Sequence, residues 1–214
     1  MSQIKLKHSG GNSSIIAAPS SNPASDVTFR LPNADGSAGQ FMKTDGSGNL
    51  AFAAGGGITM VDNWYVNAQL QPASGTNTIS ANWERGTSAQ FGSIGSAMTQ
   101  SSGIFTFPST GIYYCSINGG FFRGSGYRRY VGFTLQTTSD NGSNYTSASS
   151  NYDSISGDTN DNTSAAVTTT FVFDVTNTST HKVRFQTEAS DSGTTITSVN
   201  GRYLNVLFMR LGDT

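Results

Sequence analysis

The sequence contains little charge, a single cysteine and few of the residues that build helices. Only 12% of its 214 residues are charged, and glutamate occurs only at Glu84 and Glu188. Serine, threonine, asparagine and glycine fill much of the chain instead. Such a composition is too uncharged for an ordinary disordered tail and too poor in leucine, lysine and glutamate for many helices. We therefore expect an all-β protein with almost no helix.

The missing charge and missing apolar runs also exclude classes of partner. The formal net charge of −1 gives no electrostatic reason to expect a nucleic acid or an anionic membrane. No apolar run follows the basic residues of Met1–His8, and no later segment reaches the roughly 18 to 20 apolar residues that span a bilayer. We expect a soluble chain that neither binds nucleic acid nor inserts into a membrane. Cys115 alone forms no internal disulfide, and the alternation around it predicts a buried core position.

The sequence lacks the combinations of residues that catalysis requires. Its two histidines, His8 and His181, lie in different predicted domains, and it has no nucleophile elbow, phosphate-binding loop or metal-spaced set of His and Cys. Carboxylate pairs that cleave polysaccharides lie about 5 to 10 Å apart, and folding alone could bring such a pair together here. We expect no enzymatic activity and no cofactor.

One loop has a composition that suits a metal ion. The segment 151–162 contains the carboxylates of Asp153, Asp158 and Asp161 and several amides, an oxygen-rich set that suits calcium. The segment lacks the fixed spacing of a known calcium loop, so a solvated turn region with Asx-type hydrogen bonds is the favoured interpretation. No metal site is predicted, and calcium binding by the Asp153–Asp161 loop is left open.

Residues 1–57 differ from the rest of the chain. Short apolar pairs such as Ile4/Leu6 are separated by turn residues, and Asp35–Phe41 is echoed by Asp45–Leu50 as a tandem of Asp-Gly turns. So few apolar side chains cannot offset a chain entropy of about 1 to 2 kcal/mol per ordered residue. We expect this segment to be ordered by a partner or by copies of itself. The glycine run at 55–57 marks the boundary with a second domain, residues 58–214.

The second domain has the strand pattern of a jelly roll. About nine short segments of alternating or aromatic-rich sequence are separated by Gly, Asn, Asp and Ser, as in an antiparallel two-sheet sandwich. The predicted strands are Asp62–Gln69, Ala89–Ile94, Gly103–Phe107, Gly111–Phe122, Tyr127–Gln136, Asn144–Ser150, Ala165–Val175, Lys182–Glu188 and Tyr203–Leu211.

The last predicted strand is apolar on both of its faces. A strand of this kind must be covered on both sides, whereas one face of a single sandwich meets no core. We therefore predict association of copies through this strand, the alternative being a central strand that is fully buried within one subunit. The interface candidates are Tyr203, Leu204, Val206, Leu207, Phe208 and Met209.

The segment Gly103–Ile117 reads aromatic-x-aromatic-Pro-x-x-Gly-aliphatic-Tyr-Tyr, and we interpret it as a β-hairpin. It resembles the strand pair of the globular heads shared by complement component q and tumour-necrosis-factor-like proteins. Phe173–Phe185 and the closing strand extend the likeness over roughly residues 60–214. The resemblance implies a homotrimeric jelly-roll head that binds other molecules, catalyses nothing and has its final strand along the trimer axis.

The N-terminal domain resembles a different family. Lys7–Asn12, Phe29–Gly36 and Gly39–Gly46 are similar to the start of tail-fibre and other appendage proteins of tailed bacteriophages, notably those of marine hosts. The combination implies a virion fibre or spike that is assembled in the host cytoplasm. Residues 1–57 would form a shaft or attach to other virion proteins, and the head would bind a host surface glycan or protein. The alternative is a capsid decoration or tail-assembly component with no receptor-binding role.

Two regions are candidates for the receptor contact. Phe121–Tyr130 places three arginines and two tyrosines around a Gly-Ser-Gly turn, and aromatic faces stack on sugars while guanidinium groups bind anionic substituents. Strand alternation would also be compatible with a subunit interface here. A second region, rich in Ser and Asn, has the composition of a binding surface. The receptor-binding candidates are Tyr127, Arg128, Tyr145 and Tyr152.

Overall fold

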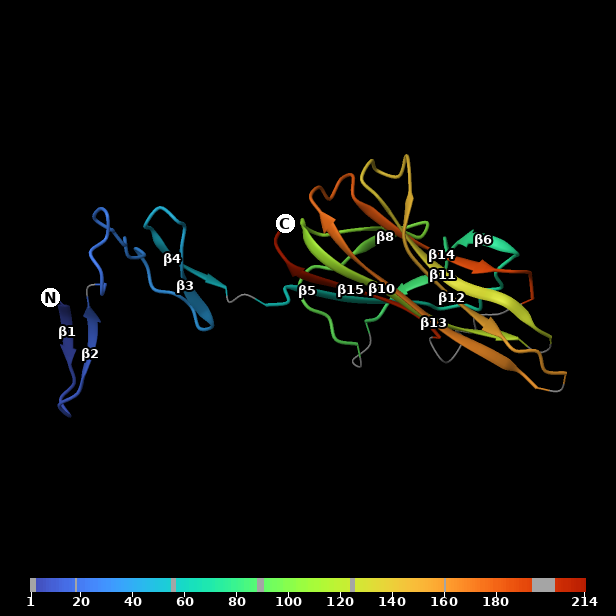
Figure 1. Ribbon diagram of the computed structural model, residues 1–214, viewed down its shortest axis with the longest axis horizontal. Helices are drawn as coiled ribbons and strands as arrows, with labels where there is room; N and C mark the ends of the chain where they lie inside the picture. Colours follow the sequence, from blue (N-terminus) through green and yellow to red (C-terminus); the bar gives the residue numbers. More distant parts are fainter. Residues whose placement is uncertain are drawn as a thin grey trace. The chain divides into compact units, whose positions relative to one another are not determined.

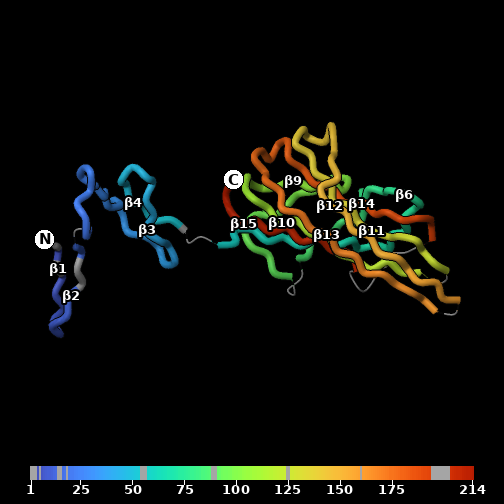
Figure 2. Tube along the Cα trace, in the orientation of Figure 1, coloured from blue at the N-terminus to red at the C-terminus, as the bar shows by residue number. Residues whose placement is uncertain are grey.

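The computed structural model describes residues 3–17, 19–54, 57–87, 91–123, 126–159, 161–193 and 203–214. The regular elements of these residues are all β-strands, which confirms the predicted all-β class (Figure 1). The same residues contain no helix that is long and apolar enough to cross a membrane. The chain divides into two compact units, Met1–Gly56 and Gly57–Thr214, and Figure 2 traces the backbone of each.

The N-terminal unit contains two separate antiparallel hairpins. Strand β1 (Gln3–Lys7) pairs with β2 (Ser13–Ala17), and β3 (Gln40–Thr44) pairs with β4 (Leu50–Ala54). Asp45 closes the turn between β3 and β4, because its Oδ1 accepts the backbone N–H groups of Ser47 and Asn49 at 2.8 and 3.1 Å. A further bond from the Asn49 side chain is the main cause of the lowered pKa of Asp45.

The second unit, called the head here, is a sandwich of two antiparallel sheets. The inner sheet has the order β13-β10-β15-β5-β7, and the outer sheet has the order β12-β11-β14-β9-β8, with β6 also pairing with β14. The inner strands are β5 (Met60–Val66), β7 (Trp83–Arg85), β10 (Gly111–Arg123), β13 (Thr163–Val175) and β15 (Leu204–Gly212). The outer strands are β6 (Gly75–Thr78), β8 (Thr99–Ser101), β9 (Ile104–Thr106), β11 (Arg128–Thr138), β12 (Thr146–Ile155) and β14 (Lys182–Ala189).

The long strands lie close to their predicted positions, and the short ones do not. Strands β6, β7 and β8 are three or four residues long and polar in large part, so they carry no alternation to detect. The predicted strand Ala89–Ile94 lies partly outside the described residues, and its remainder forms only an isolated bridge between Ile94 and Val61. Strand β12 continues to Ile155, so residues 151–155 of the oxygen-rich segment 151–162 belong to a strand.

The interpretation of Gly103–Ile117 as a hairpin is wrong. Strand β9 belongs to the outer sheet and β10 to the inner sheet, so the turn from Pro108 to Gly111 carries the chain from one sheet to the other. Tyr113 holds this corner, because its hydroxyl donates to the carbonyl oxygen of Ser109 at 3.0 Å. The true hairpin is β8–β9, whose two-residue turn has positive φ at both Ser102 and Gly103, as a type I′ turn requires.

The core between the sheets is built around the ring of Phe105. Its centroid lies 5.1 Å from the rings of Trp83 and Phe208 and 5.7 Å from that of Phe185. Such edge-on and tilted aromatic pairs add to the large apolar area that each ring buries. Cys115 is also fully buried, as predicted, and this burial raises the pKa of its thiol.

The last strand, β15, divides its apolar residues between two faces of the inner sheet. Leu204, Val206 and Phe208 are completely buried in the core of the head. They are therefore unavailable to another subunit, and their assignment to a subunit interface is corrected. Leu207 and Met209 alternate with them and lie on the opposite, partly exposed face of the sheet.

Candidate functional site

The solvent face of the outer sheet carries a group of polar and aromatic side chains. Along β11, Val131, Phe133 and Leu135 are buried in the core, so the intervening side chains lie on the solvent face. Strand register aligns neighbours from β12 and β14 with them. Gly132 pairs with Tyr152 on one side and with Glu188 on the other. These residues form what we call the tyrosine face: Tyr130, Thr134, Tyr145, Ser150, Tyr152, Arg184 and Glu188.

Tyr152 lies on the backbone of Gly132. A Cβ atom built on Gly132 would be 2.5 Å from Cδ1 of Tyr152 and would also collide with the carbonyl oxygen of Asn151, so only glycine leaves room for the ring. The ring of Tyr130 packs nearly perpendicular to that of Tyr152, with centroids 5.9 Å apart and an interplanar angle of 83°. Tyr152 remains 45% exposed. The two rings therefore form a fixed aromatic corner that is open to solvent.

A hydrogen-bonded chain of polar groups lies beside this aromatic corner. The hydroxyl of Thr134, itself 1% exposed, donates to Oε1 of Glu188 at 2.6 Å. Because that hydroxyl has a single proton, it must accept in its second bond, so the Ser150 hydroxyl donates to it at 2.7 Å. The carboxylate of Glu188 and the Ser150 hydroxyl are thus held in fixed positions on either side of a buried threonine.

Tyr145 and Arg184 form a second cluster on the tyrosine face. The guanidinium carbon of Arg184 lies 3.7 Å from the ring centroid of Tyr145, and Arg184 Nε donates to Gln136 Oε1 at 2.8 Å. Partial burial raises the pKa of Tyr145, and the charge of Arg184 opposes this only in part. The guanidinium plane of Arg184 is already stacked on Tyr145, and its Nε already donates to Gln136. The cluster is therefore a structural unit of the sheet and not an open binding surface.

The four receptor-binding candidates do not form one site. Tyr127 lies at the end of β11 that pairs with Ile155, and Tyr145 lies beyond the end that pairs with Thr146. At roughly 3.3 Å per residue, these ends are about 30 Å apart. Tyr127 is 59% exposed. The structure thus leaves Tyr127 and Tyr152 as exposed tyrosines on separate parts of the surface.

Arg128 is corrected from a contact residue to a structural one. Its side chain is buried, and it donates to the carbonyl oxygens of Tyr127 and Ser192 at 2.9 and 2.6 Å. It also forms an ion pair with Asp191 at 2.6 Å. A guanidinium that is buried and held by these groups joins two loops of the head and cannot reach a ligand.

The exposed face of the inner sheet carries a row of apolar residues. Val172, Tyr114, Met209 and Val61 are directly opposite one another on four adjacent strands, and Leu207 is two residues from Met209 on the same side. Val172 is 53% exposed. We call these five residues the association face. A contiguous apolar surface across four strands is typical of a protein–protein contact.

A groove of about 370 Å³ lies at one end of this exposed face. The rings of Phe122 and Tyr203 pack edge to face at its wall, with centroids 5.0 Å apart. Asn118 donates to Asn205 across the groove at 2.7 Å. Tyr203, predicted as an interface residue, is 46% exposed and lies on this side of the sheet.

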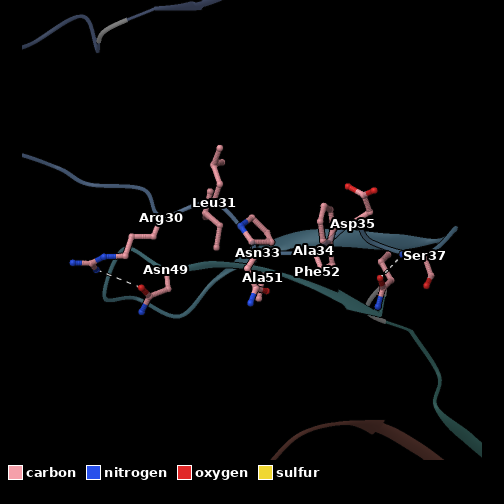
Figure 3. Close-up of a pocket in the computed structure, with 12 residues that line it drawn as sticks. Arg30, Leu31, Asn33, Ala34, Asp35, Ser37, Asn49, Ala51 and Phe52 are labelled. Atoms are coloured by element: carbon pink, nitrogen blue, oxygen red, sulfur yellow. Dashed lines mark hydrogen bonds between the residues drawn. The ribbon is translucent and has the colours of Figure 1, made fainter.

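The N-terminal unit exposes its large apolar side chains. Every buried apolar residue of the described chain belongs to the head, beginning at Met60. An open hollow of about 640 Å³ lies between the segment 30–37 and the β3–β4 hairpin, where Arg30 donates to Asn49 at 3.4 Å (Figure 3). The exposed large apolar side chains of the N-terminal unit are Ile4, Leu6, Ile16, Val27, Phe29, Leu31, Phe41, Met42 and Phe52.

The described residues contain no group of three or more His, Cys, Asp or Glu side chains that could hold a metal ion. In the oxygen-rich segment 151–162, Asp158 Oδ1 accepts the backbone N–H of Asp161 at 3.1 Å, an Asx-type bond of the kind expected for a solvated turn. Asp153 belongs to β12, and Asn160 lies outside the described residues.

No sequence pattern predicted the polar half of the tyrosine face. Thr134, Arg184 and Glu188 lie on different strands from Tyr152, and only the register of β11 with β14 brings them close. The available signal was the rarity of glutamate. The only glutamates in the sequence are Glu84 and Glu188, and Glu188 lies on this face.

Comparison with solved structures identifies the type of fold. The chain is similar to murine APRIL, crystallised at pH 5.0, with a TM-score of 0.51 and 12% identity over 71% of this chain and 98% of that one. It is also similar to Eiger TNF from S. frugiperda, with a TM-score of 0.55 and 9% identity over 72% and 94% of the two chains. No protein-family model matches the sequence, and no curated protein matches it significantly. The head therefore has the predicted jelly-roll fold of tumour-necrosis-factor-like proteins.

Proposed function

We propose that this protein is a homotrimeric appendage of a bacteriophage virion, a tail fibre or spike whose head binds the host surface and catalyses nothing. The observation that carries the proposal is the association face, where four strands expose a row of apolar side chains on a tumour-necrosis-factor-like sandwich. The globular heads that this domain resembles form homotrimers. Burial of such an apolar row between subunits would stabilise the association by roughly 25 cal/mol per Å² of apolar surface.

The N-terminal unit supports attachment to a particle. Its similarity to the start of phage appendage proteins suggests the location, and its exposed apolar side chains need a partner to cover them. We assign residues 1–57 to contact with other virion proteins or to a shaft made with the other two copies. The head is then the part that projects.

The tyrosine face supports receptor binding by the projecting head. It combines solvent-exposed aromatic surface with fixed hydrogen-bonding groups, the combination that binding sites use for specificity. A purely structural role, as a capsid decoration or tail-assembly component, would instead bury this face against another virion protein.

Two measurements test the proposal. Sedimentation of the full chain should give the mass of three copies, and a stable monomer at micromolar concentration would refute the trimer. A cryo-electron microscopy map of the whole particle should show residues 1–57 against the virion and the tyrosine face in solvent. A map in which another protein covers that face would favour the structural alternative.

A further inference from the structure

We infer that the tyrosine face is a binding site for a neutral sugar, with one pyranose ring seated on Tyr152 beside Glu188. The inference rests on the proposed function in that it names the class of receptor. The evidence for it is the geometry of one chain, so it can be tested without a particle.

The aromatic corner provides the apolar half of the site. The ring of Tyr152 is supported from below by Gly132 and from the side by Tyr130, so it loses little conformational freedom when a ligand binds. The C–H groups on one face of a pyranose form an apolar surface that matches an aromatic ring. A ring that is 45% exposed, yet fixed by two neighbours, suits such stacking.

Glu188 and Ser150 provide the polar half. A sugar presents adjacent hydroxyl groups at the edge of its ring, and each of these can donate a proton to a fixed acceptor. Among the described residues, the Glu188 carboxylate accepts one bond, from Thr134 to Oε1, which leaves further acceptor positions for ligand hydroxyls. Ser150 donates to Thr134, so its oxygen also keeps its acceptor capacity.

The charge at this position selects against acidic sugars. Glu188 lies directly across Gly132 from Tyr152, and the sheet positions paired with these two residues carry no basic side chain. Arg184 is engaged with Tyr145 and Gln136, and the guanidinium of Arg129 stacks on the ring of Tyr130, with its carbon 5.5 Å from the ring centroid. A carboxylated or sulfated ring on Tyr152 would place its anion close to the Glu188 carboxylate, and like charges at short distance repel. We therefore assign the site to neutral hexoses and N-acetylhexosamines.

The test is a titration of the full-length chain, monitored by saturation-transfer NMR. The neutral ligands are maltotetraose, cellotetraose and chitotetraose, and the acidic ligand is a tetramer of galacturonic acid. At least one neutral oligosaccharide should bind at millimolar concentration, and the acidic one should bind more weakly. Tyr152→Ala should weaken binding by about tenfold or more, which is the effect of roughly 1.4 kcal/mol. Tyr152→Phe should retain most of the affinity, because it keeps the stacking surface.

Two further variants separate stacking from charge. Glu188→Gln should weaken binding of the neutral ligand and reduce the discrimination against galacturonic acid. Asp153→Ala is the matched control, because Asp153 is the exposed next residue of β12 and its side chain lies on the other side of the strand. Absence of binding by every neutral oligosaccharide, preference for the acidic one, or equal effects of Tyr152→Ala and Asp153→Ala would overturn the inference. None of these outcomes would alter the trimer mass or the position in the particle, so the proposed function is tested separately.

Discussion

Arg85 Nε lies 2.6 Å from Oδ1 of Asp62, a carboxylate that is completely buried beneath the inner sheet. The second oxygen of Asp62 accepts the indole N–H of Trp64 at 2.9 Å and the backbone N–H of Met98 at 2.8 Å. One side chain thus connects β5, β7 and the segment before β8. A buried carboxylate is tolerated only when such partners satisfy it.

Removal of this carboxylate should destabilise the head strongly. Asp62→Ala leaves the Trp64 and Met98 donors without an acceptor and Arg85 without its counter-ion, so we expect a loss of about 3 to 5 kcal/mol in unfolding free energy. Asp213→Ala is the control, because it breaks the pair with Arg210 at an exposed carboxylate and should cost less than about 1 kcal/mol. Urea unfolding at one fixed protein concentration gives both values. Equal losses of unfolding free energy for Asp62→Ala and Asp213→Ala would show that the buried ion pair stabilises the head no more than the exposed one.

The turn between β11 and β12 should have an acid-sensitive carboxylate. Asp140 accepts a bond from Thr138 Oγ1 and others from the backbone and side chain of Asn144, and these lower its pKa from 3.8 to about 2. Because the folded pKa is lowered, the carboxylate stabilises the turn fully above about pH 4, and this contribution is lost as the pH falls toward 2. NMR titration of the Asp140 carboxyl carbon should show the midpoint near 2. A midpoint at 3.8 would mean that these bonds do not form in solution.

Substitutions on the two faces of β15 should have different effects. Met209→Asp places a charge on the association face and should give a folded monomer, as measured by sedimentation and circular dichroism. Phe208→Ala, on the core face, should instead cost about 3 to 5 kcal/mol of stability. Thr76→Lys adds a charge at an exposed position of β6 in the outer sheet, opposite Glu188, so it is the control and should leave a trimer. A trimer that survives Met209→Asp would place the subunit contact elsewhere.

The same strand shows how far the sequence could predict the structure. Both alternating sets of β15 are apolar, so the pattern predicted two covered faces, but only the burial of each set in the folded head shows that Phe208 faces the core and Met209 faces outward. The hairpin interpretation of Gly103–Ile117 was wrong for a related reason. Local spacing identifies a turn, whereas the sheet to which each strand belongs depends on contacts with β14 and β15 that are distant in sequence.

The candidate site was predicted in part. Tyr152 is exposed, as its Ser- and Asn-rich surroundings indicated, and Tyr127 is exposed next to Gly126. Arg128 follows Tyr127 directly, yet its side chain turns into the head and binds Asp191 and Ser192. Composition could not distinguish these neighbours, because burial of an arginine depends on whether carbonyl and carboxylate partners from a distant loop are available.

The head should fold without the N-terminal unit. A chain that begins at Ile58 retains every buried apolar residue of the described structure, so its melting temperature should match that of the full chain at equal concentration. If the protein is a virion appendage, as proposed, this shortened chain should fail to enter particles when it replaces the full chain during infection. Phe41→Ser in the full chain removes one exposed apolar side chain and should reduce incorporation while leaving melting unchanged. A large fall in melting temperature on truncation would show that residues 1–57 are part of the head's own folding unit.

Adsorption of virions should depend on the tyrosine face if the head is a receptor-binding unit. Phages that carry Tyr152→Ala with Tyr127→Ala retain the core and the association face, so their particle yield should equal that of the wild type. Their adsorption rate to host cells should fall by about tenfold or more, because each exposed ring of a binding site contributes on the order of 1 to 2 kcal/mol. The two single variants then distinguish the surfaces, since Tyr152 belongs to the aromatic corner and Tyr127 lies at the far end of β11. Normal adsorption by the double variant would favour the decoration role. A loss of particle yield would instead mean that these tyrosines contact another virion protein, because neither contributes to the core of the head.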